Sequence, residues 1–284
     1  MSCSLSRWIS APILLLLSLP AFAGSLLFAV NEGTSSATDA IFIKEKYAAL
    51  ANYLAAATGE NIRLETPKVL SIVQRNLARK RYDLLLVRPS NLSARALRDQ
   101  DYRLLAVANG NAKVHFIVRA DSKLKEIADI HGHSIALPDP LAYPSTLGLA
   151  LLRDLGVKVN PQQIKYMDRQ DAVGLVVQSG LADVGVVMSY SKTGAEWAAN
   201  GGRFLYSKGR LPYWSVIVSS QVAPKTVERL QRALLALNQP PSKDKILNSL
   251  GIAGFSEGDT RAYLDMLDWV EGRRPAKIAK VERP

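Results

Sequence analysis

Four short segments rich in Ser, Thr and Asn each follow an apolar run and precede a helical pattern. They are NEGTSSATD (31–39), RPSN (88–91), PDPLAYPST (138–146) and SYSKT (189–193). Ser, Thr and Asn are good helix N-caps, so each segment taken alone indicates only a helix start. Helix starts also leave backbone N–H groups without partners and carry partial positive charge. If all four meet at one cleft, they predict an anion-binding site.

The segment YPSTLG (143–148) is the strongest of the four. Pro144 fixes the backbone and pushes Tyr143 out of the helical region, so Ser145 is expected to cap the helix. The backbone N–H groups expected to remain free belong to Thr146, Leu147 and Gly148. Gly148 also lets a ligand approach the backbone without meeting a side chain.

Side chains in the other segments add candidate anion partners. Arg88 follows an apolar strand directly and is a candidate for a direct ion pair with an anion. The remaining candidates in these loops are Ser90, Asn91, Ser189 and Tyr190. One helix terminus contributes only about 0.3–2 kcal/mol to anion binding, whereas micromolar affinity needs about 8 kcal/mol. Several charge-assisted hydrogen bonds of about 1.5–3 kcal/mol each are therefore required.

The elements that position these loops alternate between short apolar strands and helical periods. Strands are expected at 25–30, 62–64, 82–87, 102–108, 113–120, 134–137, 163–167, 184–188 and 213–219. Helices are expected at 39–59, 71–80, 90–99, from 145, at 171–180, 193–200, 224–237, 242–250 and 259–271. This alternation predicts an α/β fold with parallel sheets covered by helices on both faces.

The pattern divides into two α/β blocks of similar content, about 25–107 and 113–205. The later strand and the final helices have no third sheet, so they are expected to return to the first block. The fold class is two doubly wound α/β lobes joined by two crossings, near 107–113 and 206–212. Lobe 1 is expected to contain 24–107 plus 207–284, and lobe 2 to contain 108–206. Ligands of such sheets bind beyond the carboxyl ends of the strands, here between the lobes.

The N-terminus is typical of an exported protein. Residues 1–23 have one charge, an apolar core and small residues at the end, which predicts a secretory signal peptide cleaved after Ala23. The alternative is an N-terminal membrane anchor, but the apolar stretch is short for a bilayer span. Cleavage removes Arg7 and the single cysteine, Cys3, and leaves 35 basic and 25 acidic residues. The short n-region favours the periplasm of a bacterium.

The net charge of the whole chain, +11, restricts the partners. A basic protein binds nucleic acid, an anionic membrane or acidic ligands. Export argues against nucleic acid, and the basic residues are spread along the chain without a long run. An anionic membrane surface and acidic ligands therefore remain as partners. The basic tail, GRRPAKIAKVERP, is expected to be a solvated extension.

Motifs of enzymes and cofactor sites are weak or missing. SYSKTG (189–194) contains both S-x-x-K and K-T-G, but in acyl-serine enzymes the two lie on separate elements. His131 and His133 have no third ligand nearby, so we expect no metal site. The chain has no G-x-G-x-x-G, P-loop, H-E-x-x-H or nucleophile elbow, and no cofactor is expected. Among the aromatics, Tyr213 or Trp214 is the candidate for facing the cleft.

Five stretches resemble one family in the same order along the chain. They are KYAALANYLAAATG (46–59), YDLLLVRPSNLSARAL (82–97), ADSKLKEIADIHGHSIALPDP (120–140), YPSTLGLALLRDLGV (143–157) and DAVGLVVQSGLADVGVV (171–187). Together they are similar to the phosphate/phosphite/phosphonate-binding branch of the bacterial solute-binding proteins of ABC transporters. The resemblance implies a type II periplasmic-binding fold. It also implies a non-enzymatic, monomeric receptor that delivers an oxyanion to a membrane permease.

The resemblance also implies roles for individual residues. Ser145 and Thr146 match phosphoryl ligands, Tyr47 matches a cleft aromatic, and the pair Ser90–Asn91 matches the loop of the first lobe. Two positions depart from the family pattern. Leu147 stands where a second Ser is common, and Gln170 stands where a His is common.

These departures leave the ligand open. One hydroxyl and one possible cation are missing, so a phosphonate, another anion, or a zwitterion whose amine meets Asp171 all remain candidates. The alternative job for the same fold is a ligand sensor that presents its bound state to a sensor kinase. A hydrolase using the hydroxyl-rich cleft is disfavoured because no general base accompanies Ser145.

Overall fold

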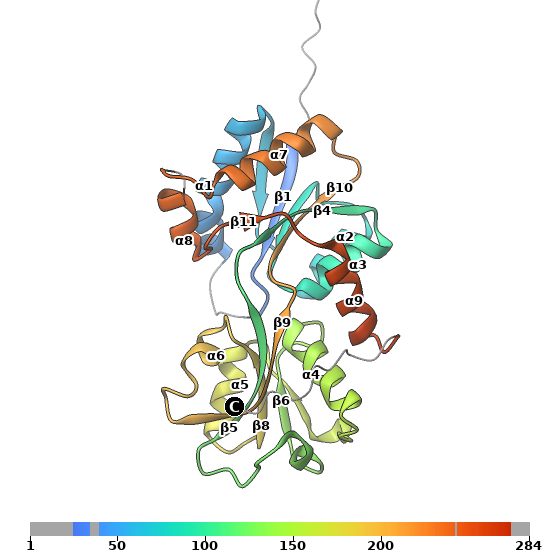
Figure 1. Ribbon diagram of the computed structural model, residues 1–284, viewed down its shortest axis with the longest axis vertical. Helices are drawn as coiled ribbons and strands as arrows, with labels where there is room; N and C mark the ends of the chain where they lie inside the picture. The colour runs from blue at the N-terminus through green and yellow to red at the C-terminus, as the bar shows by residue number, and fades with distance from the viewer. Residues whose placement is uncertain (1–24, 35–39, 242, 274–284) are drawn as a thin grey trace, which may run out of the picture.

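The computed structural model describes residues 25–34, 40–241 and 243–273 (Figure 1). The expected signal peptide, Cys3, most of the basic tail and part of the loop 31–39 lie outside these residues. The described helices include none long and apolar enough to span a bilayer. Two α/β lobes lie one above the other, and chain crossings connect them.

The sheet of lobe 1 has six strands in the order β11-β4-β10-β3-β1-β2. The strands are β1 (Ser25–Asn31), β2 (Asn61–Glu65), β3 (Leu84–Val87), β4 (Tyr102–Ala108), β10 (Ser215–Ser219) and β11 (Phe255–Ser256). Strands β2, β1 and β3 are parallel, whereas β10 lies antiparallel between β3 and β4. The chain that returns from lobe 2 therefore completes this sheet.

Helices cover both faces of this sheet because its central strands are apolar on both sides. The helices of this part of the chain are α1 (Ala40–Thr58), α2 (Leu70–Ala78), α3 (Ser90–Asp99), α7 (Pro224–Ala236), a π-turn (Lys243–Leu247), α8 (Asn248–Leu250) and α9 (Thr260–Val270), the last of which lies mainly against α3 and α4 rather than against the sheet. Phe28 and Val30 of β1 pack into the core beneath α1 and α7, whereas Leu27 and Ala29 pack beneath α2 and α3. This period-two alternation buries β1 on both faces, and the loop after its carboxyl end reaches lobe 2 through the contact of Thr34 with Gln170.

The sheet of lobe 2 has five strands in the order β7-β6-β8-β5-β9. The strands are β5 (Ala112–Arg119), β6 (Ile135–Leu137), β7 (Ile164–Tyr166), β8 (Val184–Met188) and β9 (Gly202–Leu211). The helices are α4 (Tyr143–Asp154), α5 (Gln170–Gln178), α6 (Lys192–Glu196) and two 3-10 turns, η1 (Ile127–Ile130) and η2 (Pro161–Gln163). Val186 of β8 and Leu151 of α4 belong to one apolar core.

One long strand and the type of both sheets differ from the sequence expectation. Residues Gly202–Leu211 form β9, which pairs antiparallel with β5 from Arg119↔Gly202 to Ala112↔Leu211. The crossing expected at 206–212 is therefore wrong, because the second crossing follows Leu211. Both sheets are mixed rather than parallel, because the strands that enter from a crossing run opposite to their neighbours.

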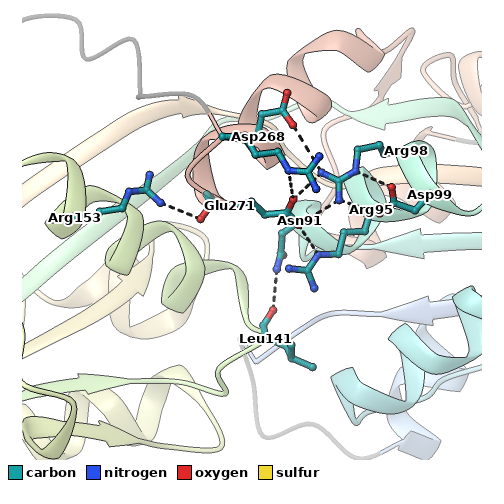
Figure 2. A network of polar contacts seen from close by, with 10 residues as sticks. Asn91, Arg95, Arg98, Asp99, Leu141, Arg153, Asp268 and Glu271 are labelled. Atoms are coloured by element: carbon teal, nitrogen blue, oxygen red, sulfur yellow. Dashed lines mark hydrogen bonds and ion pairs between the residues drawn. The ribbon is translucent and has the colours of Figure 1, made fainter.

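The last described helix, α9, touches both lobes beside the crossings (Figure 1). Glu271, just after α9, accepts hydrogen bonds from Arg95 and Arg98 of α3 at 3.2 and 2.7 Å. Trp269 of α9 donates to Asp154 of α4 at 2.7 Å. Figure 2 shows the α3 side of this network and the contact of Arg153 with the backbone at the end of α9. The helix thus braces lobe 1 against lobe 2.

Candidate ligand-binding site

The four strand-to-helix loops meet between the lobes, as the sequence predicts. Asn91 of the second loop donates to the carbonyl of Leu141 in the third at 2.9 Å, a contact visible in Figure 2. The guanidinium of Arg88 lies 5.3 Å from the ring centroid of Tyr190 in the fourth loop. The carbonyl of Thr34, in the first loop, accepts a hydrogen bond from the backbone amide of Gln170 in lobe 2 at 3.0 Å.

A buried polar cluster stands at the carboxyl ends of β1 and β3. We define it as Glu32, Lys46, Tyr47 and Arg88. Oε1 of Glu32 accepts hydrogen bonds from Nζ of Lys46 at 2.7 Å and from the Tyr47 hydroxyl at 2.8 Å. Nη2 of Arg88 lies 3.5 Å from the same oxygen. Tyr47 and Arg88 are candidates from the sequence, and the structure brings them together with two residues that the sequence analysis did not select.

Two aromatic rings, Tyr190 and Trp214, stand against Arg88, and Tyr213 stacks on Trp214; we call these three rings the aromatic wall. The guanidinium carbon of Arg88 lies 3.6 Å from the centroid of the Trp214 ring. Trp214 stacks on Tyr213 at 5.3 Å and meets Tyr190 edge-on at 6.2 Å. That Tyr213 or Trp214 faces the cleft stays a prediction, because neither residue lines the cavity between the lobes. The indole Nε1 of Trp214 is buried and has no hydrogen-bond partner among the described residues.

The electrostatics of the cluster favour a fixed set of charges. Burial opposes the ionisation of Glu32, but Arg88 and Lys46 outweigh it and hold the pKa of this carboxyl below its usual value. Burial, reinforced by the Glu32 charge, raises the pKa of Tyr47 well above its usual 10.0. Tyr47 is therefore a neutral hydrogen-bond donor at neutral pH, and Glu32 is an anion.

A cavity of about 360 Å³ opens beside Glu32 between the lobes. This volume is at the small end of the range for ligand pockets, about 300–1,000 Å³. Its polar lining includes Glu32, Lys68, Asp139, Asp168 and Arg169. The apolar part of the lining comes from Val30, Ile43, Val69 and Leu70. Three carboxylates and two basic groups thus share one small space.

Helix α4 starts earlier than the sequence predicts. Its first residue is Tyr143, and its N-cap is Ala142 rather than Ser145. The amide of Thr146 donates to the carbonyl of Ala142 at 3.1 Å. The expectation that this amide stays free is therefore wrong, because the Pro144 ring fits the first turn of a helix. The amides of Leu147 and Gly148 lie further inside the helix, where they join its hydrogen-bond ladder.

The side chains of this segment are engaged inside the protein. The hydroxyl of Ser145 is fully buried and donates to the carbonyl of Pro138 at 3.0 Å. That of Thr146 donates to the carbonyl of Tyr143 at 3.0 Å. Leu147 packs in the core of lobe 2. A Cβ added to Gly148 would come within 3.0 Å of Val186, so this glycine permits close packing of α4 on β8 rather than access for a ligand.

The other candidates, Ser90, Ser189 and Asp171, do not line the cavity. Ser90 donates to the backbone of the second crossing, at the carbonyls of Pro212 and Tyr213 (3.0 and 2.9 Å). Ser189 accepts from the amide of Lys113 at 3.1 Å. Asp171 pairs with Arg169 at 3.0 Å and does not line the cavity.

Gln170, where the family pattern favours His, ties the two lobes together. Its side-chain oxygen accepts from the amide of Met188 at 2.6 Å, and its nitrogen reaches the Thr34 hydroxyl at 3.5 Å. Its own amide donates to the Thr34 carbonyl at 3.0 Å. The residue is 1% exposed, so it closes the space between the lobes at this position.

Four charged residues of the site were not among the candidates from the sequence: Glu32, Lys46, Lys68 and Arg169. One signal was present for Glu32: it is the single charged side chain at the start of the loop that follows β1. Lys46 directly precedes Tyr47 on α1, but a lysine on an amphipathic helix is usually solvated. Lys68 and Arg169 come from loops whose approach depends on how the two lobes face each other.

The sequence profile of one family matches residues 33–263. The family is described as ABC transporter, phosphonate, periplasmic substrate-binding protein. The chain belongs to this family. Its members are periplasmic binding proteins rather than enzymes, and they serve ABC transporters together with a membrane permease. No curated protein matches the chain.

Solved structures show the same fold at low sequence identity. XAC2383 from Xanthomonas citri, bound to chloride ion, has a TM-score of 0.73 and 16% identity, with 87% of this chain and 98% of that chain covered. PhnD1 from Prochlorococcus marinus, in complex with methylphosphonate, gives 0.71 and 12%, with coverage of 88% and 98%. PA3383 from Pseudomonas aeruginosa gives 0.67 and 13%, with coverage of 86% and 85%. The fold is therefore that of a type II periplasmic binding protein.

Proposed function

We propose that this chain captures a small oxyanion of the phosphonate or phosphate class in its interlobe cleft and delivers it to an ABC permease. The observation that carries the proposal is the convergence of Lys46, Tyr47 and Arg88 on one buried point, which Oε1 of Glu32 occupies in this structure. Two cations and a neutral phenol supply charge-assisted hydrogen bonds, which are about twice as strong as neutral ones. Trp214 adds a buried N–H donor beside them.

The family and the fold support this ligand class. PhnD1, which has the same fold, binds methylphosphonate, and the cavity beside Glu32 has the size for such a molecule. In the proposed cycle the ligand enters while the lobes are apart, and the lobes close over it by a hinge motion about the two crossings. The mature protein, starting at Gly24, acts as a monomer in the periplasm. Intact mass of the exported protein checks the cleavage site.

A second candidate ligand is a zwitterion with an anionic and an ammonium end. The specific observation in its favour is that Glu32, Asp139 and Asp168 line the same cavity as Lys68 and Arg169. Such a lining balances a ligand that has both charges. Asp171 is a weaker partner for the amine than the sequence suggests, because it pairs with Arg169.

A thermal-shift panel tests the proposal. The purified mature chain is heated with methylphosphonate, phosphite, phosphate, sulfate, acetate or an aminoalkylphosphonate. A ligand present at 100 times its Kd adds about 2.7 kcal/mol to the free energy of unfolding, so its effect on the melting temperature is large. Stabilisation by phosphorus oxyanions but not by acetate supports the proposal. Stabilisation by none of them contradicts it, and a hit confined to the aminoalkylphosphonate favours the zwitterion.

A further inference from the structure

One carboxylate oxygen of the protein collects the donors of the polar cluster. Oε1 of Glu32 accepts from Lys46 at 2.7 Å and from Tyr47 at 2.8 Å, and Arg88 lies 3.5 Å away. An ammonium, a phenol and a guanidinium are the same groups that hold an oxyanion ligand. They surround an anion that belongs to the chain itself.

Burial strengthens the interactions among these charged groups. The side chains of Glu32 and Arg88 are only 8% and 9% exposed. Charges in such a place interact strongly, and removing one partner leaves the other uncompensated. A ligand that takes the donors must therefore provide its own negative charge, and the Glu32 carboxylate must move elsewhere.

The surroundings of Glu32 provide somewhere to move. Glu32 follows the last residue of β1 and precedes Gly33, whose φ of +67° is a conformation that favours glycine. The side chain borders the 360 Å³ cavity, which is also lined by Lys68 and Arg169. A displaced carboxylate has open space on that side, with two basic neighbours, Lys68 and Arg169, beside two acidic ones, Asp139 and Asp168.

We propose that Glu32 is a built-in competitor, whose carboxylate occupies the oxyanion site until a ligand displaces it into the adjacent cavity. This inference rests on the proposed function. If the site is open for only a fraction of the time, the observed Kd rises by the inverse of that fraction. Glu32 therefore weakens binding and eases release of the ligand to the permease.

Isothermal titration with methylphosphonate on the native chain and on Glu32→Gln tests the inference. Gln keeps the size and one acceptor oxygen but removes the competing charge, so we expect binding about tenfold tighter or more. Glu32→Ser, which removes the carboxylate entirely, is expected to change the affinity in the same direction. If Glu32 merely positions Arg88, both variants bind more weakly than the native chain.

Glu60→Gln is the matched control. Glu60 also pairs with an arginine, Arg229 at 3.1 Å, but it precedes β2 at the opposite end of the sheet. The same change of net charge there is expected to leave the affinity unaltered. A Glu32→Gln chain that is unfolded alone is expected to fold when methylphosphonate is added, because the ligand replaces the missing anion.

The outcomes separate the two proposals. Native binding that is unchanged or weakened in Glu32→Gln overturns the competitor role and leaves the proposed function standing. Failure of methylphosphonate to rescue an unfolded Glu32→Gln chain also overturns the competitor role. Absence of binding by the native chain and by both variants overturns the competitor role and the proposed function together.

Discussion

The guanidinium carbon of Arg88 lies 3.6 Å from the centroid of the Trp214 ring. The sheet of lobe 1 dictates this contact, because Val87 of β3 pairs with Ser215 of β10 in antiparallel register. Arg88 and Trp214 are the next residues outward on the two strands. The return of the chain from lobe 2 thus places an aromatic face against the main cation of the cleft. A cation–π contact of this kind is worth about 0.5–2 kcal/mol.

Replacing Trp214 tests whether the ring positions the guanidinium. Trp214→Leu removes the aromatic face, so we expect methylphosphonate to bind about 2–30-fold more weakly, the range that a contact of about 0.5–2 kcal/mol implies. Trp214→Phe keeps a ring in place and is expected to lose less affinity. Isothermal titration of both variants measures the difference. Equal affinities for the Leu and Phe variants would show that the stacking contributes nothing.

Gln170 is expected to matter for stability and for lobe closure. Gln170→Ala leaves the buried amide of Met188 without its acceptor, which costs about 1–3 kcal/mol of unfolding free energy. Chemical denaturation measures this loss. Gln163→Ala is the control, because the side chain of Gln163 donates to the exposed carbonyl of Gly132. A Gln170→Ala chain as stable as the control would show that the contacts of Gln170 between the lobes contribute little to the free energy of unfolding.

Ser145 separates the sequence expectation from the structural finding. Its hydroxyl is fully buried and donates to the Pro138 carbonyl, so Ser145→Ala is expected to lower the free energy of unfolding by about 1 kcal/mol or more. The affinity for methylphosphonate is expected to stay within twofold of native. A large loss of affinity at unchanged stability would show that Ser145 contacts the ligand.

Much of the lobe 1 fold follows from local patterns. Strand 102–108 and helix 90–99 have the predicted bounds, because an apolar run and an amphipathic period are local signals. Strand β9 was not predicted, because its sequence, GRFLYSKGRL, is neither apolar nor strictly alternating. The strand with which it pairs, β5, is distant in sequence. The directions of β9 and β10 depend on the path that the chain takes between the lobes. A short stretch of sequence does not contain that information.

The site was predicted in outline but not in its charges. The loops meet as expected, and Tyr47, Arg88 and Tyr190 lie together. The prediction that Ser145 and the amides after it bind the ligand assumed a helix that begins at residue 145. The helix begins two residues earlier, at Tyr143. The role of Glu32 could not be read from its own loop, because its partners come from helix α1 and from the end of β3.

His115 predicts an acid-sensitive stability. It is buried in lobe 2, lies 2.6 Å from the Ser207 hydroxyl and stacks on Phe204. Burial, aided by the nearby charge of Lys113, lowers the pKa of His115 from 6.5 to about 4. As the pH falls below 6.5, His115 of the unfolded chain takes up a proton, whereas His115 of the folded chain stays neutral until the pH approaches about 4. Stability is therefore lost between pH 6.5 and about 4, by up to about 3 kcal/mol.

Chemical denaturation from pH 7 to pH 4 measures that loss. His115→Gln is expected to show a shallower decline than the native chain, because the variant has no imidazole to protonate. His131→Gln, at an exposed turn, is expected to keep the native slope. Identical slopes for the native chain and both variants would assign the acid sensitivity to other groups.

The most direct test of the oxyanion site is a calorimetric titration of methylphosphonate into the native chain, Arg88→Lys and Arg95→Lys. Lys keeps the charge that Glu32 needs but removes the guanidinium fork and its stacking on Trp214, so Arg88→Lys is expected to bind at least about tenfold more weakly. Arg95 pairs with Glu271 away from the cleft, so Arg95→Lys is expected to bind like the native chain. Native-like binding by Arg88→Lys would contradict the account.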